Sequence, residues 1–258
     1  MRHTFFFTFF LLLVVQHSLF AQNKYDFSQF GHETGTFFTQ PFHWEGSDWL
    51  KFGLMSAGTI LAMQADQPVR TLVQRDQRYY NSVPIEGGRI WGEIYMPIAL
   101  FSGFALHSLI ANDIGTRKIA YEIGQASLYA AAITYTMKFV FGRARPYTDE
   151  GAFTYHPFTL SDDGFHSLSS GHATIAFVLS TVLSRNANSG FLKVLAYVPA
   201  AFTVVSRVYQ DHHWVSDNLL GAAVGYFVAT WVVDQHEQED GRIGLSSIYP
   251  LTVRIILN

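Results

Sequence analysis

Six long apolar segments limit what this 258-residue chain can fold into. Each is longer than a typical strand and is rich in Ala, Leu and Met as well as Val, which predicts helices. The connections between them carry Pro, Gly, Asn and charged residues, which end helices. We therefore expect an all-α protein. Its six predicted helices are residues 49–65, 95–111, 119–141, 172–183, 191–205 and 219–233.

The composition excludes several classes of protein. Hydrophobic residues make up 49% of the chain and charged residues 14%, with a formal net charge of −3, so the chain is not a disordered tail. This charge balance gives no electrostatic reason to bind nucleic acid. The chain has no cysteine, which excludes disulfides, a thiol nucleophile and a cysteine-ligated metal.

The N-terminal segment has the pattern of a secretory signal peptide. A basic start precedes an apolar stretch, and Ser18 and Ala21 occupy the −3 and −1 positions of a cleavage site. We expect residues 1–21 to be removed, leaving a protein of the periplasm or cell envelope. After them we predict an irregular N-terminal arm at 22–46, a helical catalytic domain at 47–235 and a C-terminal tail at 236–258. The tail would begin in a solvated acidic turn and include a short strand at 251–257.

Whether the helices cross a bilayer is a separate question. A span needs about 20 mostly apolar residues, and the uninterrupted apolar runs here are shorter. Their length favours a soluble or peripheral protein, and an integral membrane protein with several helical spans is the alternative.

The first group of chemically active residues surrounds the end of the third predicted helix. Lys138 and Arg145 are seven residues apart, close to two helical turns, so we expect both cations on one helix face. Pro146 then ends the helix. Arg143, between them, is expected to face solvent more than substrate.

The second group precedes the fourth predicted helix. In the segment Ser170-Gly171-His172, Ser can cap the helix and Gly lets the backbone approach a ligand closely. The free N–H groups and the helix dipole favour an anion. His172 would face that anion from the first turn.

The third group joins the fifth and sixth predicted helices. It contains Arg207 and then His213 and Asp217, whose i, i+4 spacing lets the carboxylate bond one ring nitrogen and present the other as a nucleophile or base. Neighbouring His212 is expected to be exposed or behind the site, and Asp211 to be a local charge partner. A further acidic stretch, residues 162–164, is expected to form a turn rather than a calcium loop.

Bundle topology brings the three groups together. In an up-and-down bundle the end of the third helix, the start of the fourth, the end of the fifth and the start of the sixth share one end. The expected fold is therefore a helical bundle of about six core helices with the active site at one end. Three cations around one small volume, Lys138, Arg145 and Arg207, suit a tetrahedral oxyanion such as phosphate.

The three motifs in order, Lys-x6-Arg-Pro, Ser-Gly-His and Ser-Arg-x5-His-x3-Asp, resemble the type 2 phosphatidic acid phosphatase (PAP2) and vanadium haloperoxidase superfamily. The resemblance extends from Lys138 to Asp217. One position departs from it: Ser169 stands where the family usually has Pro, which we expect to change the loop and keep the chemistry.

The resemblance implies a metal-independent phosphatase with no cofactor, acting on a phosphate monoester or a lipid or isoprenyl phosphate through a phosphohistidine. His213 would attack phosphorus, Asp217 would fix its tautomer, and His172 would protonate the leaving group and then activate water. The phosphoryl oxygens would be bound by Lys138, Arg145, Ser170, Gly171 and Arg207.

Two other functions remain open from the sequence. The same residues fit vanadate, so a vanadate-dependent haloperoxidase is one alternative. The other is a non-catalytic envelope protein that binds phosphate or lipid headgroups. The expected partner is a phosphorylated small molecule or lipid, with no nucleic acid, and membrane association is compatible with either kind of substrate.

Overall fold

The computed structural model describes residues 24–239, and the regular elements in this part of the chain are helices, with no strand. This confirms the predicted all-α fold class. The helices are α2 (Phe27–Thr39), α3 (Gly46–Val73), α4 (Val83–Trp91), α5 (Tyr95–Ala111), α6 (Ile114–Phe141), α7 (Gly171–Asn186), α8 (Gly190–Leu195), α9 (Val198–Tyr209) and α10 (Val215–Glu239). Short 3₁₀ turns lie at Gln40–His43, Pro146–Thr148 and Asp163–Phe165. The predicted signal peptide and the predicted strand at 251–257 lie outside the described residues.

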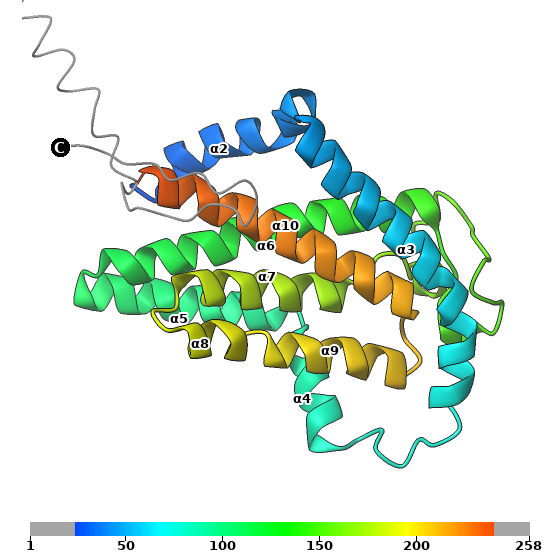
Figure 1. The fold of residues 1–258 in the computed structure, drawn as a ribbon. Helices are drawn as coiled ribbons and strands as arrows, with labels where there is room; N and C mark the ends of the chain where they lie inside the picture. Colours follow the sequence, from blue (N-terminus) through cyan, green and yellow to red (C-terminus); the bar gives the residue numbers. More distant parts are fainter. Residues whose placement is uncertain (1–23, 240–258) are drawn as a thin grey trace, which may run out of the picture.

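The core lies where α6, α7 and α10 pack together. Ile123 and Tyr129 of α6, Leu179 of α7 and Val232 of α10 are fully buried there. Figure 1 shows α7 between α10 and the α8–α9 pair, with α3 crossing obliquely near the start of α10. α4 packs against α9, and α5 against α6.

The N-terminal arm, predicted to be irregular, contains the helix α2 instead. Its Phe, Gly and Thr residues are weak helix formers, so packing rather than propensity stabilises it. Asp26 caps the helix by accepting a hydrogen bond from the Gln29 amide at 2.9 Å. Phe37 stacks on Tyr129 with ring centroids 4.3 Å apart.

The connection after α3 and the fifth predicted helix also differ from expectation. The segment predicted to be an open connection contains α4, which has Pro84 in its first turn, where the missing N–H costs nothing. The predicted helix at 191–205 is two helices, α8 and α9. Pro199 lies in the first turn of α9 and cannot donate the hydrogen bond that would continue a helix through it.

The predicted acidic turn after the last helix is wrong as well. α10 continues to Glu239, so the boundary drawn between 235 and 236 falls inside a helix. Arg185 of α7 pairs with Asp234 at 2.7 Å and also with Glu237. His236 is buried beside Glu122 of α6. These contacts give the acidic residues fixed partners in place of solvent.

Candidate active site at one end of the bundle

The three motifs meet at one end of the bundle, where α6 and α9 end and α7 and α10 begin (Figure 1). The Arg207 guanidinium Nη1 lies 3.2 Å from Nε2 of His172. The Ser170 amide donates to the backbone oxygen of Asp217 at 3.1 Å. The Lys138 ammonium donates to the carbonyl of His166 in the loop before α7. The structure thus brings the three motifs together as the topology argument predicted.

The route from Lys138 to Arg145 differs from the expected continuous helix. α6 ends at Phe141, and Gly142 has a left-handed φ of +56°. A Cβ at Gly142 would lie 1.7 Å from the carbonyl oxygen of His156, so this turn requires glycine. Arg145 therefore lies beyond the helix in extended backbone. The expectation that Lys138 and Arg145 share one helix face is wrong.

Arg145 nevertheless points back to the site through the loop at 163–165. Its Nη2 donates to Asp163 Oδ1 at 2.7 Å and its Nε donates to the Asp163 carbonyl at 2.9 Å. Its positive charge still acts on both Lys138 and His213. The predicted turn at 162–164 is present, with Asp162 accepting from the Gly164 amide at 2.9 Å.

The start of α7 has the predicted capped form. Ser170 is the N-cap, and its Oγ accepts a hydrogen bond from the Ala173 amide at 3.3 Å. Gly171 is the first helical residue and His172 the second. Ser169, at the position that departs from the family pattern, is buried, and its Oγ has no hydrogen-bond partner among residues 24–239.

His213 lies just before α10, with only 2% of its side chain exposed. Its Nδ1 is 3.7 Å from Asp217 Oδ2, within ion-pair reach and longer than a hydrogen bond. Burial, and then the charges of Arg145 and Lys138, hold the pKa of His213 well below its ordinary value. A neutral imidazole with a free electron pair is therefore its form at neutral pH.

Asp217 is held in place by donors other than His213. It accepts hydrogen bonds from the Trp214 amide at 2.9 Å, from Ser167 Oγ at 2.5 Å and from Arg143 Nη1 at 2.6 Å. Arg143 is fully buried. The expectation that it faces solvent is wrong. Because burying an unpaired guanidinium is very costly, its place beside the carboxylate is what makes this burial stable.

The second carboxylate on Arg143 comes from a residue that the sequence did not indicate. Asp66 of α3 accepts from Arg143 Nη2 at 2.7 Å, and from the amide and hydroxyl of Ser216 at 2.9 and 2.5 Å. Asp66 thereby ties α3 to the first turn of α10. The predicted helix ended at residue 65, which placed Asp66 in the following connection, whereas α3 continues to Val73 and buries Asp66 inside the helix.

Glu93, between α4 and α5, is the second residue that the sequence analysis missed. Its Oε1 lies 3.3 Å from Nε2 of His172. Burial, followed by the charge of Arg207, lowers the pKa of His172 to about 4, and Glu93 acts in the opposite direction. The pair Gly92-Glu93 directly before an apolar segment was the signal that could have identified it.

The loop before α10, which carries His212 and His213, is also tied to the end of α3. Asp211, predicted to have a local charge partner, instead binds the distant Arg70 through two hydrogen bonds of 2.8 and 2.7 Å. Arg70 also pairs with Asp149 at 2.7 Å. His212 is partly buried, and burial followed by Arg207 and Arg145 lowers its pKa to about 4.

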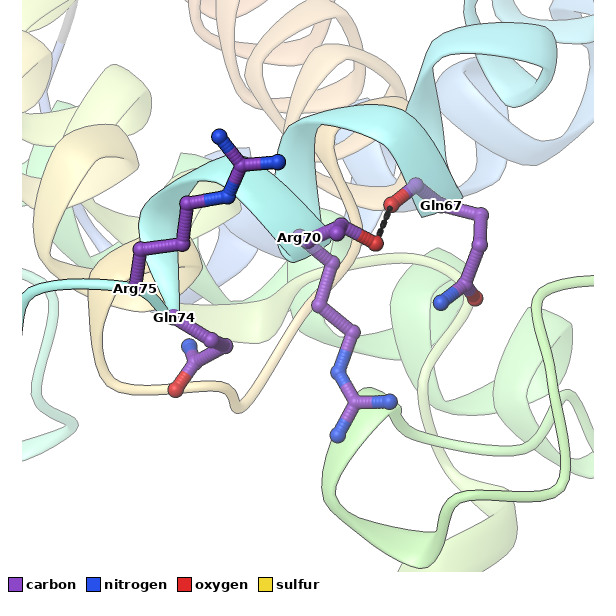
Figure 2. A pocket seen from close by; sticks show the side chains of 5 residues that line it. Gln67, Arg70, Gln74 and Arg75 are labelled. Carbon is purple, nitrogen blue, oxygen red and sulfur yellow. Dashed lines mark hydrogen bonds between the residues drawn. The ribbon is translucent and has the colours of Figure 1, made fainter.

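A shallow open pocket of about 280 Å³ lies on the last turns of α3 (Figure 2). It is lined by side chains of α3 and the residues that follow it, and none of the predicted site residues lines it. Figure 2 shows Arg70 and Arg75 extending in different directions from this helix end, with Arg70 the one that reaches the neighbouring loops. Within residues 24–239, no group of three or more His, Asp or Glu side chains is placed to hold a metal ion.

Comparison with known proteins supports the family resemblance that the motifs predicted. The model of the PAP2 superfamily matches residues 122–240, the region that contains all three motifs. Lipid A 1-phosphatase of Porphyromonas gingivalis is 36% identical over 102 residues, which are 38% of this chain and 20% of that protein. The chain thus matches about a fifth of the length of this curated relative. The match over residues 122–240 confirms the resemblance to the PAP2 superfamily that the motifs predicted.

Two solved structures share the fold. Aquifex aeolicus LpxE superposes with a TM-score of 0.50 and 17% identity, covering 66% of this chain and 94% of that one. The transmembrane PAP2-type phosphatidylglycerolphosphate phosphatase of Bacillus subtilis superposes with a TM-score of 0.52 and 18% identity, covering 71% and 94%. α3, which carries Asp66, and the α4–α5 corner, which carries Glu93, precede the region matched by the family model.

Proposed function

We propose that this protein is a metal-independent phosphatase that hydrolyses a lipid phosphate through a phosphohistidine. The observation that carries this proposal is the buried, neutral His213, which faces Asp217 on one side and lies among the cations Lys138, Arg145 and Arg207. A neutral imidazole surrounded by positive charge suits attack on a phosphate.

In the first step, Nε2 of His213 forms a bond to phosphorus and the ester P–O bond breaks. Nδ1, which faces Asp217, carries the ring proton, and the carboxylate stabilises the imidazolium that forms. His172 gives a proton to the departing oxygen. The phosphoryl oxygens are held by Lys138, Arg145, Arg207, Ser170 and the Gly171 amide.

In the second step, water attacks the phosphohistidine. His172, now neutral, takes a proton from that water, the P–N bond breaks, and inorganic phosphate and free His213 are formed. The cationic side chains supply the electrostatic stabilisation that a metal ion supplies in other phosphatases.

Exposed apolar side chains support a lipid as the substrate. Gly190–Tyr209 is long and apolar enough to cross a membrane, and α4 with α5 passes the same test as a pair bent by 67°. α3 and α6 are each 28 residues long but are not among the described helices that pass this test. Such continuous apolar faces indicate contact with lipid. The exposed side chains include Leu54, Ile60 and Leu61 of α3, Leu106, Leu109 and Ile110 of α5, and Phe191, Val194 and Phe202 of α8 and α9.

We therefore infer that the outer faces of α3, α5, α8 and α9 lie in the membrane and that the site at the end of the bundle receives a phosphate headgroup. The names of the similar proteins, a lipid A 1-phosphatase and a phosphatidylglycerolphosphate phosphatase, are consistent with this substrate class. Localisation in the cell envelope follows from the same inference.

The first test compares the wild type with His213→Ala. Cells expressing the full chain are fractionated, and phosphate release from phosphatidic acid and from an aryl phosphate is measured in each fraction with EDTA present. We expect activity in the membrane fraction and a loss of at least about 10⁴-fold in the variant, because the nucleophile is removed. Activity retained by the variant would refute the phosphohistidine route, and activity toward the aryl ester alone in the soluble fraction would refute the lipid assignment.

A further inference from the structure

The corner between α4 and α5 approaches the start of α7 more closely than a side chain would permit. A Cβ on Gly92 would lie 2.7 Å from the carbonyl oxygen of His172 and 2.8 Å from its Cβ. Glycine at this position therefore lets the corner lie against the first turn of α7. The next residue, Glu93, is thereby brought beside the imidazole.

Glu93 belongs to a closed ring of six polar side chains. Arg89 donates to Glu93 Oε1 at 2.7 Å and to Glu86 Oε2 at 2.8 Å. Gln210 donates to Glu86 Oε1 at 2.7 Å and accepts from Arg207 Nη2. Arg207 and Glu93 both reach Nε2 of His172, which closes the ring.

We propose that Glu93 is a positioning residue for His172: it fixes the orientation of the imidazole and supplies the negative charge that favours its protonated form during departure of the leaving group. This inference rests on the proposed function for the role of His172. It assigns a task to α4 and α5, which lie outside the region matched by the family model.

The charges that face His172 explain why such a carboxylate is needed. Arg207 reaches it from α9, Arg145 acts on it from the loop after α6, and His213 lies near it from the loop before α10. The two arginines and burial all disfavour an imidazolium. Glu93 is the one carboxylate that forms an ion pair with His172 in the part of the chain that the structure describes.

The effect of losing Glu93 on the rate should depend on the leaving group of the substrate. An alkyl alcohol leaves poorly as an alkoxide and needs the proton from His172, whereas p-nitrophenolate leaves without one. A defect in the acid should therefore affect a lipid phosphate more than p-nitrophenyl phosphate. A defect in binding or folding should affect both substrates alike.

The experiment compares wild type, Glu93→Gln and Glu93→Asp in detergent micelles, with short-chain phosphatidic acid and p-nitrophenyl phosphate as substrates. The matched control is Glu150→Gln, which removes a half-exposed carboxylate paired with His156. For Glu93→Gln we expect kcat to fall at least about tenfold for phosphatidic acid and less than about threefold for the aryl ester, with KM little changed. The alkaline limb of kcat should move about one pH unit lower, because loss of the negative charge favours neutral His172. Glu93→Asp should recover part of the loss.

A second readout does not depend on activity. In protein labelled with ¹³C-histidine, the His172 signals are assigned by their loss in His172→Asn and titrated by NMR. We expect the titration midpoint to be lower in Glu93→Gln and unchanged in Glu150→Gln. Equal losses on both substrates, or an unchanged His172 titration, would overturn the assignment of Glu93. If the wild type were inactive and the His172 midpoint were still lower in Glu93→Gln, the proposed function would be overturned. The contact between Glu93 and His172 would then still be supported.

Discussion

His213 and His172 each face a carboxylate, but their surroundings differ. His213 and Asp217 are four residues apart and fully buried, and Asp217 is fixed by three further donors. His172 and Glu93 come from distant parts of the chain, and about a quarter of each side chain is exposed. A nucleophile needs one fixed orientation, which burial provides. An acid that must also take a proton from water needs solvent access, which the more open pair allows.

The largest predicted effect comes from removing Arg143, the buried cation that holds Asp217 in place. Arg143→Gln would leave Asp66 and Asp217 buried without their shared cation. We expect the free energy of unfolding to fall by about 3–5 kcal/mol, because uncompensated buried charge is strongly destabilising. Equilibrium unfolding in detergent, followed by circular dichroism, measures this change.

The control for this prediction lies at the other end of the bundle. Arg185→Gln also removes an arginine that bridges two carboxylates, but all three side chains are partly exposed. Solvent screening limits its expected cost to about 1 kcal/mol. Equal costs for the two variants would show that burial does not distinguish the Arg143 network.

A smaller effect is expected from moving His172 and Glu93 apart. Gly92→Ala places a methyl group within 2.8 Å of His172 and must push the α4–α5 corner away. We expect kcat for phosphatidic acid to fall between about tenfold and a hundredfold, because a displacement of about 1 Å can cost that much. Phosphate release over a substrate series measures it.

The matched control is Gly58→Ala in α3, where an added Cβ meets nothing within 4 Å. There we expect unchanged activity and a stability gain of up to about 1 kcal/mol, because Ala is the better helix former. If Gly92→Ala behaved like Gly58→Ala, the close approach at the corner would not be needed for catalysis.

The difference between the two pairs also explains what the sequence could predict. The His213–Asp217 pair is encoded within five residues, and bundle topology then placed it beside His172 and Arg207. The partners of Glu93 and Asp66 could not be predicted from neighbouring residues, because these contacts depend on how α3 and the α4–α5 corner pack. Arg143 was misjudged because its burial depends on carboxylates from two other helices. The helix α2 was missed because its packing, rather than its residues' propensity, stabilises it.

The smallest predicted effect concerns the pair His172–Glu93 and separates the effect of charge from the effect of the position of Glu93. Arg89 Nη1 and His172 Nε2 both approach the same Glu93 oxygen, at 2.7 and 3.3 Å. Arg89→Gln removes a cation that competes for this oxygen, so Glu93 should favour the imidazolium more strongly. The pKa of His172 should rise, and the alkaline limb of kcat should move to higher pH by a fraction of a unit, opposite to Glu93→Gln. Because the ring is partly exposed, the shift should shrink at high salt.

Arg78→Gln, which removes an exposed arginine paired with Asp76, is the control and should leave the alkaline limb of kcat unchanged. A shift to lower pH in Arg89→Gln would mean that the ring acts by holding Glu93 in place rather than through its charge.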